Sequence, residues 1–199
     1  FHKVDFGLPE NSIIYCSLNS NHKITPNIFN VWMNILIKVK KSVLWIYANN
    51  DVARENLKFE AKKRGVEPER VIFAEQVSII DHIERIKLAD IYLDTFPYNA
   101  HTSASECIRA GLPLITLMGN SFASRVASSL LKSINMHELI TTKIDDYEKL
   151  AIKLGNKKKE LNNIKNKIKT NIKSSSLYDI KQFTINLENI YKELVDKNL

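Results

Sequence analysis

Short apolar runs alternate along the chain with longer segments in which apolar residues recur at helical spacing. The run at 12–18 precedes a polar loop, which is typical of a buried strand. In the segment at 26–40, Phe29, Trp32 and Leu36 fall on one face, which predicts an amphipathic helix. The same criteria predict strands at 42–47, 70–74, 90–94 and 113–117, helices at about 51–64, 80–87, 103–110, 122–134, 144–154, 156–172 and 179–197, and a short ambiguous element at 138–140.

This alternation predicts an α/β fold, a doubly wound parallel sheet with helices on both faces. Ligands of such sheets bind beyond the carboxyl ends of the strands. The loops at 19–23, 75–82 and 95–103 each follow a predicted strand, so we expect all three at that edge. The sequence contains neither G-x-G-x-x-G nor G-x-x-x-x-G-K-[ST], which argues against the common dinucleotide-binding and P-loop classes.

The stretch from Asp94 to Gly111 combines a strand end, a polar loop and a small-residue helix. The first-turn amides of a helix have no intrahelical partner and face the positive end of its dipole. His101, Thr102 and Ser103 stand at this point, and an imidazole with two hydroxyls suits a phosphate or diphosphate. The alternative is that Thr102 or Ser103 simply caps the helix.

Composition limits the classes of protein that fit. The chain has 199 residues, 44% of them hydrophobic and 26% charged, enough for one well-buried domain or at most two small ones. The net charge of +7 is concentrated between Lys157 and Lys173, where a solvated helix face is the usual explanation. A nucleic-acid binder ranks last, because aromatic residues do not interleave with these lysines and no RNA-binding motif occurs.

Cysteines and apolar runs indicate the compartment. Cys16 and Cys107 are far apart without metal-ligand spacing, so we expect reduced thiols in a cytoplasmic protein. No apolar run reaches the roughly 18 residues of a membrane span. The chain opens at Phe1 without an initiator Met, and we expect it to be a fragment of a longer protein.

Several motifs carry a resemblance to a known family. The run Asp-Thr-Phe-Pro-Tyr-Asn-Ala-His-Thr-Ser at 94–103, with Glu106 and the Ala-Gly-Leu-Pro at 110–113, resembles the O-GlcNAc transferase family, and more narrowly its bacterial tetratricopeptide-repeat-containing members. The segments at 23–26, 42–45, 88–95 and 123–127 fit the same family in the same order. The resemblance covers most of the chain.

The resemblance implies roles for residues that are matched one by one. Lys23, His101, Thr102 and Ser103 are expected to hold the diphosphate of a UDP-sugar, and Lys23 and His101 to stabilise the departing UDP. The alternative for Lys23 is an exposed surface lysine. For the nucleoside, the resemblance implies the backbone of Val77 and the side chain of Arg85 at the uracil, His82 near the uracil and sugar, and Glu106 at the ribose.

The chain departs from the family pattern at several positions. Glu106 stands where the family usually has Asp, and it could instead complement the helix dipole. Ile79 stands near a ribose-contacting lysine and cannot make that bond, and Ser20 replaces an amide of the animal enzymes. For Asp94 we expect a structural role, bonding loop amides, in preference to a general base.

The family's fold is GT-B, two Rossmann-like lobes with the active site between them, and this chain matches the C-terminal lobe. We therefore expect a linker at 1–10, a nucleotide-sugar-binding lobe at 11–175 and a C-terminal helix at 176–199. The first lobe and any tetratricopeptide repeats would lie outside the chain.

The resemblance implies an inverting glycosyltransferase that transfers a sugar, expected to be GlcNAc, from UDP to a protein Ser/Thr or similar acceptor, with no metal or cofactor. The isolated fragment is expected to be inactive. A non-catalytic UDP-sugar-binding or interaction module that keeps the fold is the alternative.

The last predicted helix carries an apolar stripe. Phe183, Leu187, Ile190, Tyr191 and Leu194 recur at helical spacing. The closing helix of GT-B enzymes commonly braces the first lobe, so the resemblance implies that part of this stripe packs against protein outside the chain. The alternative is that the stripe packs wholly on its own domain.

Overall fold

The computed structural model describes residues 1–197, and within them the strands form one six-stranded parallel sheet. The order is β3-β2-β1-β4-β5-β6. Strands β1 to β3 therefore follow one another in one direction across the sheet, and β4 to β6 follow in the opposite direction, starting beside β1. This confirms the predicted doubly wound α/β fold. The strands are β1 (Ile13–Ser17), β2 (Ser42–Tyr47), β3 (Val71–Ala74), β4 (Ile91–Leu93), β5 (Leu114–Leu117) and β6 (Ile140–Thr141).

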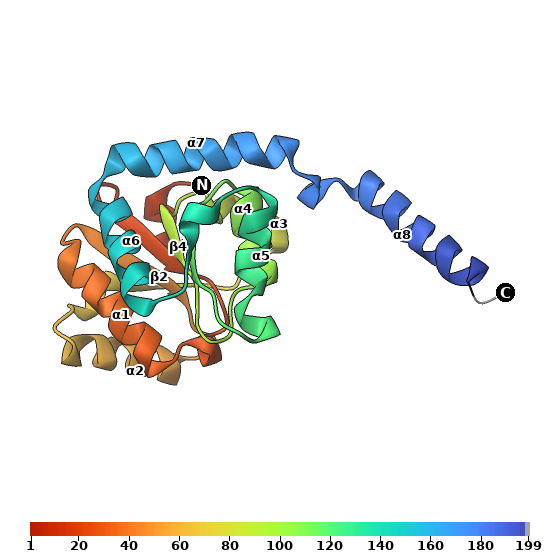
Figure 1. Cartoon of the computed structure of the whole chain (residues 1–199). Coiled ribbons are helices and arrows are strands. Elements are labelled where there is room, and N and C mark those ends of the chain that lie inside the picture. The colour runs from red at the N-terminus through yellow and green to blue at the C-terminus, as the bar shows by residue number, and fades with distance from the viewer. Residues whose placement is uncertain (198–199) are drawn as a thin grey trace.

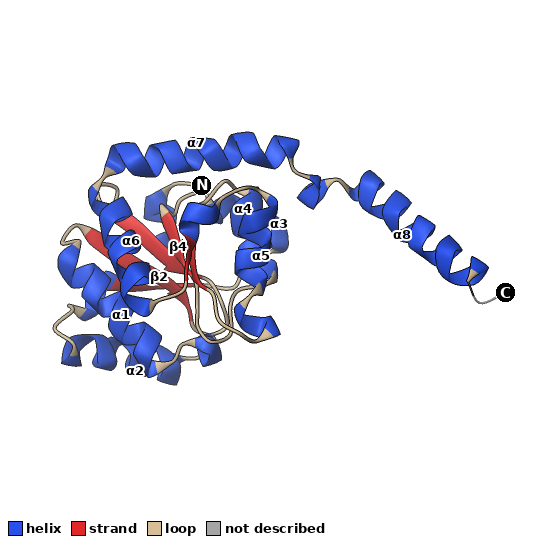
Figure 2. Cartoon of the chain, viewed as in Figure 1, coloured by secondary structure: helices blue, strands red, loops and turns tan. Residues whose placement is uncertain are grey.

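Helices cover both faces of the sheet (Figures 1 and 2). One side carries α1 (Pro26–Lys38), α2 (Asp51–Lys63) and α6 (Ile144–Asn156), and the other carries α3 (Ile79–Ile86), α4 (Thr102–Arg109) and α5 (Val126–Ser133). The ambiguous segment at 138–140 divides between a 3-10 turn, His137–Leu139, and the start of the edge strand β6.

The helix predicted at 122–134 begins later than the pattern indicated. A 3-10 turn, Phe122–Ser124, precedes α5. The Ser121 hydroxyl accepts the Ser124 N–H at 3.3 Å, and the Ser124 hydroxyl accepts the Ser121 N–H at 3.1 Å. This reciprocal bonding closes a separate turn at Ser121, so the α-helix starts only at Val126.

Buried aromatic side chains join the helices to the end of β4. Trp32 of α1 and Tyr147 of α6 are fully buried. The Trp32 indole N–H donates to the Tyr147 hydroxyl at 3.1 Å, and this hydroxyl donates to the backbone oxygen of Asp94 at 3.0 Å. Because the polar tips of both rings are satisfied, they can pack in the core without a desolvation penalty.

The N-terminal residues, expected as a linker, contact the domain. They form a 3-10 turn, Lys3–Phe6, and the Phe6 ring packs on Trp45 with centroids 5.6 Å apart. Leu8 is buried in the same core.

At the amino ends of the strands, α7 (Lys158–Ser174) crosses the domain, and its Lys165 pairs with Asp90 at 2.9 Å.

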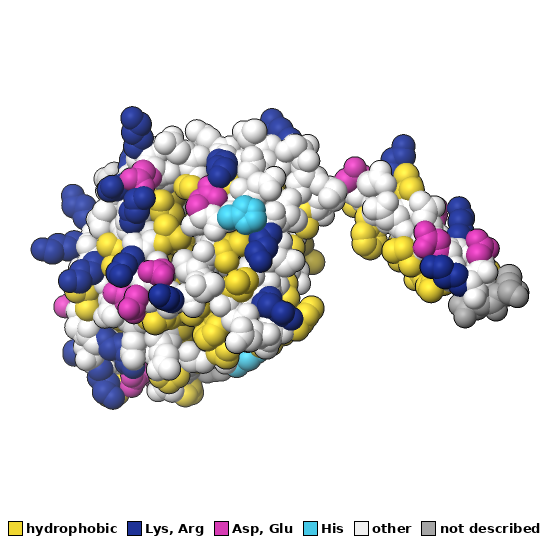
Figure 3. Space-filling model, viewed as in Figure 1, with side chains coloured by type: hydrophobic (Ala, Val, Ile, Leu, Met, Phe, Trp, Pro, Cys, Tyr) yellow, Lys and Arg dark blue, Asp and Glu magenta, His cyan; other side chains and the backbone are white. Residues whose placement is uncertain are grey.

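The last helix, α8 (Ile180–Asp196), projects away from the domain (Figure 1). None of its residues, all within the described part of the chain, is buried. Phe183 is 65% exposed and Tyr191 is 60% exposed, and apolar side chains show along the helix in Figure 3. The alternative that this stripe packs wholly on its own domain is therefore wrong. Residues 198–199 of the segment expected at 176–199 lie outside the described residues.

A hydrogen bond anchors the chain just before it leaves the domain. The Tyr178 hydroxyl donates to the backbone oxygen of Ser105 in α4 at 2.7 Å.

Among residues 1–197, no helix is both long and apolar enough to cross a membrane.

Candidate functional site

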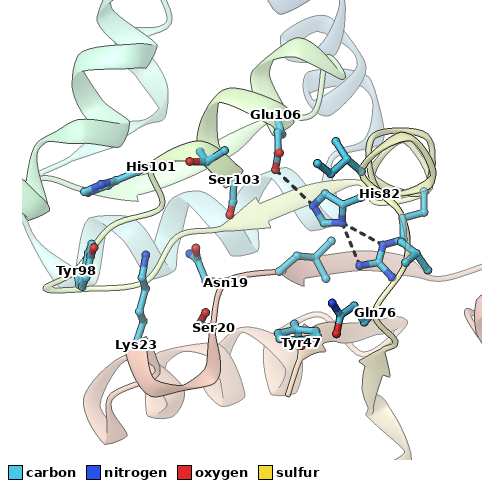
Figure 4. A pocket seen from close by; sticks show the side chains of 15 residues that line it. Asn19, Ser20, Lys23, Tyr47, Gln76, His82, Tyr98, His101, Ser103 and Glu106 are labelled. Atoms are coloured by element: carbon cyan, nitrogen blue, oxygen red, sulfur yellow. Dashed lines mark hydrogen bonds and ion pairs between the residues drawn. The ribbon is translucent and has the colours of Figure 1, made fainter. Parts of the chain in front are cut away.

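A cavity of about 490 Å³ lies at the carboxyl ends of β1 to β4. Its lining includes loops on both sides of the point where β1 and β4 are neighbours and the winding of the sheet reverses. Such switch points are where open α/β sheets bind ligands. Figure 4 shows side chains from several loops converging on it. Every residue expected to bind UDP lines it: Lys23, Val77, His82, Arg85, His101, Thr102, Ser103 and Glu106.

Asp94 organises the loop that follows β4. Its side chain is buried, and one carboxylate oxygen accepts the N–H groups of Thr95 at 2.8 Å and Ala100 at 2.6 Å. The other accepts the hydroxyl of Thr116 at 2.6 Å. Burial raises the pKa of this carboxyl to about 7, although the three hydrogen bonds and Lys23 oppose the rise. The structural role expected for Asp94 is confirmed.

The same loop is tied to the loop after β1. The Asn19 side-chain amide donates to the Thr95 hydroxyl at 3.1 Å, and that hydroxyl donates to the Tyr98 carbonyl at 2.6 Å. Asn99 donates to the Thr95 carbonyl at 2.8 Å. Two loops that are far apart in sequence are thus held as one wall of the cavity.

One end of the cavity is positive. The Lys23 ammonium donates to the Asn99 carbonyl at 3.2 Å and lies 3.9 Å from the centre of the Tyr98 ring. Burial lowers the pKa of Lys23, and Asp94 opposes this shift. Lys23 therefore forms part of the cavity wall, and the alternative of an exposed surface lysine is wrong.

Helix α4 begins at the same end. His101 is its N-cap and Thr102 its first residue; within the described chain no side-chain cap is formed by His101. The alternative that Thr102 or Ser103 caps this helix is wrong, because both lie inside its first turn. The first-turn amides and the helix dipole therefore face the cavity beside Lys23, an arrangement that favours an anion.

The other end of the cavity holds a histidine in a defined state. Arg85 donates to the Nδ1 atom of His82 from Nε at 3.2 Å and from Nη2 at 3.0 Å. An arginine cannot accept a hydrogen bond, so Nδ1 is unprotonated and the proton of the neutral ring is on Nε2. That atom lies 3.5 Å from a carboxylate oxygen of Glu106.

The pKa values at this end agree with a neutral imidazole. Burial, and secondly the charge of Arg85, lower the pKa of His82. Burial also raises the pKa of Glu106. Neither group is in bulk water, so both can offer directed hydrogen bonds to a polar ligand.

Arg85 is itself held in place. It is 3% exposed, donates to the Glu75 carbonyl, and lies 5.7 Å from the Trp45 ring. The Glu75 carboxylate forms a two-pronged pair with Arg54 at 2.7 and 2.8 Å. The loop before α3 is therefore anchored to α2, which fixes where Val77 and His82 face the cavity.

Sequence reasoning did not assign several other residues that line the cavity. Tyr47 is the last residue of β2, and Leu18 and Asn19 directly follow β1. Their position at strand ends was a usable signal. Gln76 and Tyr98 lie in loops, where the pattern does not tell which side chains turn inward. Ser20 and Ile79, noted as departures, also line the cavity.

A family model for glycosyl transferase family 41 matches residues 2–187. The chain belongs to glycosyl transferase family 41. This confirms the resemblance to the O-GlcNAc transferase family. The family 41 chain is 31% identical over 192 residues to the UDP-N-acetylglucosamine–peptide N-acetylglucosaminyltransferase of Caenorhabditis elegans, and 34% identical over 188 residues to the probable enzyme SEC of Arabidopsis thaliana.

A solved structure supports the fold of this family 41 chain. An O-GlcNAc transferase of Thermobaculum terrenum, the K341M mutant, superposes with a TM-score of 0.85 at 26% identity. The match covers 93% of this chain and 38% of that one. The two curated matches include 96% and 94% of this chain, but this chain spans only 17% and 19% of the length of those relatives. The expected fold, a Rossmann-like lobe of a GT-B glycosyltransferase, is confirmed.

Proposed function

We propose that this chain is the UDP-sugar-binding lobe of an inverting glycosyltransferase that transfers GlcNAc from UDP to Ser or Thr of a protein. The observation that carries the proposal is the convergence of every residue expected to bind UDP on one cavity at the switch point of the sheet. Membership of family 41 and the names of the curated relatives, which are UDP-N-acetylglucosamine–peptide N-acetylglucosaminyltransferases, support the same donor and acceptor.

The positive end of the cavity would take the diphosphate. Lys23 supplies a full charge, and the amides at the start of α4 supply aligned donors together with the hydroxyls of Thr102 and Ser103. His101 adds a donor from the N-cap position. Because these groups are in place before the sugar–phosphate bond breaks, they would stabilise the charge that develops on UDP. We propose no metal or cofactor for this step.

The His82 end would take the nucleoside. Nitrogen donors of Arg85 are already bonded to His82 and to the Glu75 carbonyl, so we propose that Arg85 acts at the uracil edge chiefly by fixing His82. The backbone of Val77 would read the base, and Glu106, which is directed toward His82 (Figure 4), would accept from the ribose.

Transfer needs more than this lobe. We propose that the full-length protein supplies a first lobe with the acceptor surface, and tetratricopeptide repeats, because the chain spans only about a fifth of its curated relatives. The chain alone should then bind UDP without turning over UDP-GlcNAc.

Calorimetry with UDP, ADP and uridine tests the proposal. UDP should bind more tightly than ADP, because the His82 end reads the base, and more tightly than uridine, because the Lys23 end holds the diphosphate. Equal binding of UDP and ADP would contradict the base assignment. UDP binding by a full-length protein that never turns over UDP-GlcNAc would instead favour the non-catalytic module.

A further inference from the structure

An aromatic ring contacts both Lys23 and His101 at the positive end of the cavity. Tyr98 lies in the loop after β4, lines the cavity and is 44% exposed. The Lys23 ammonium is 3.9 Å from its ring centre, over the ring. The His101 ring packs against the same tyrosine at a centroid distance of 5.1 Å and an interplanar angle of 58°. Figure 4 shows the three side chains converging.

We propose that Tyr98 is a positioning residue whose ring holds the Lys23 ammonium and the His101 imidazole where a diphosphate would meet both. This inference rests on the proposed function for the identity of the ligand. Its structural part concerns the free protein alone.

The chemistry of the partners explains why a ring serves this purpose. A cation is attracted to the face of an aromatic ring, yet the ring carries no net charge. The second partner of Lys23, the Asn99 carbonyl, is neutral as well. The ammonium is thereby held in one place while its positive charge stays available to an anion. A carboxylate at the position of Tyr98 would hold the lysine equally well but would cancel that charge.

The surroundings keep the ring itself in place. The carbonyl of Tyr98 accepts the Thr95 hydroxyl at 2.6 Å, so its backbone belongs to the loop organised by Asp94. His101 also meets a second ring, Phe122, edge-on with ring centroids 6.0 Å apart. These aromatic contacts orient the imidazole. Its Nε2 atom also lies 3.4 Å from the backbone carbonyl of Ala123.

Two variants separate the ring from the hydroxyl. Tyr98→Phe keeps the ring, and Tyr98→Leu removes it from a partly exposed site where the change is tolerable. Phe59→Leu is the matched control, because it also removes an exposed ring that lies near a lysine, Lys63 at 5.3 Å, but on α2. Calorimetry should show UDP affinity about fivefold weaker for Tyr98→Leu and unchanged for Tyr98→Phe and Phe59→Leu.

The decisive readout uses no ligand. In NMR spectra of the free wild-type protein, the methylene next to the Lys23 ammonium should be shifted upfield by the ring current, with its signal assigned by its loss in Lys23→Ala. The shift should persist in Tyr98→Phe and vanish in Tyr98→Leu. No upfield shift in the wild type, or one that survives in Tyr98→Leu, would overturn the inference even if UDP binds. A wild type that shows the shift but does not bind UDP would sink the proposed function and leave the positioning role standing.

Discussion

The backbone N–H of Ala100 donates to the carboxylate of Asp94, six positions earlier in the chain, at 2.6 Å. This one bond places the residue that precedes His101, and hence the start of α4, relative to the end of β4. The carboxylate is buried, and it bonds the loop that forms one wall of the cavity. Asp94 therefore shapes the proposed anion site through the loop that it bonds.

The buried carboxyl of Asp94 should make stability depend on pH. Its pKa is about 7 in the folded protein against an ordinary value of 3.8, so the folded state binds more protons between these values. The stability it contributes is fully present below about pH 4 and is lost as the pH rises through 7. Relative to Asp94→Asn, which never ionises, the wild type should lose on the order of a few kcal/mol between pH 4 and 8.

Urea unfolding of both proteins across this range measures the difference. Asp146→Asn, at an exposed position on α6, controls for the loss of one carboxylate. A constant difference between wild type and Asp94→Asn from pH 4 to 8 would show that the carboxyl does not titrate in this window.

The charge of Arg85 should keep His82 neutral. The pKa of His82 is lowered by burial and then by Arg85, so NMR titration of its ring should give a value below the ordinary 6.5. Arg85→Gln removes the charge and should raise this pKa, while Arg109→Gln, on the exposed side of α4, should not change it. An unaltered titration of His82 in Arg85→Gln would show that the arginine does not set its state.

The exposed stripe of α8 should cause the chain to self-associate when it is isolated. Phe183 and Ile190 are 65% and 52% exposed, and burying such a side chain contributes about 1.5–3 kcal/mol. We propose that in the full-length protein part of the stripe packs against the first lobe. Sedimentation should show oligomers of the wild-type chain, and the double variant that combines Phe183→Glu with Leu187→Glu should be monomeric.

The control for that double variant is Lys192→Glu, which changes the net charge of α8 by the same amount without touching the stripe. It should remain associated. A wild-type chain that stays monomeric, with α8 strongly protected from hydrogen exchange, would contradict the proposed packing.

Much of the fold followed from the sequence because local patterns determine it, whereas the roles of the site residues followed from the family resemblance. Strand runs followed by polar loops predicted the edge at which Lys23 and His101 lie, and parallel topology brought them together. The break before α5 was missed, because the reciprocal bonds of Ser121 and Ser124 leave no periodic signal. The inward turn of Tyr98 depends on contacts in three dimensions, which spacing along the chain does not reveal.

The central claim is that the Lys23 end of the cavity holds a diphosphate, and paired titrations of UDP and uridine test it most directly. A charge-assisted hydrogen bond contributes roughly 1.5–3 kcal/mol, so Lys23→Ala should weaken UDP binding about tenfold or more and leave uridine binding unchanged. His101→Ala should act in the same direction, and Lys63→Ala, an exposed lysine on α2, should alter neither. Equal losses for UDP and uridine in Lys23→Ala, or no loss for either, would contradict the account.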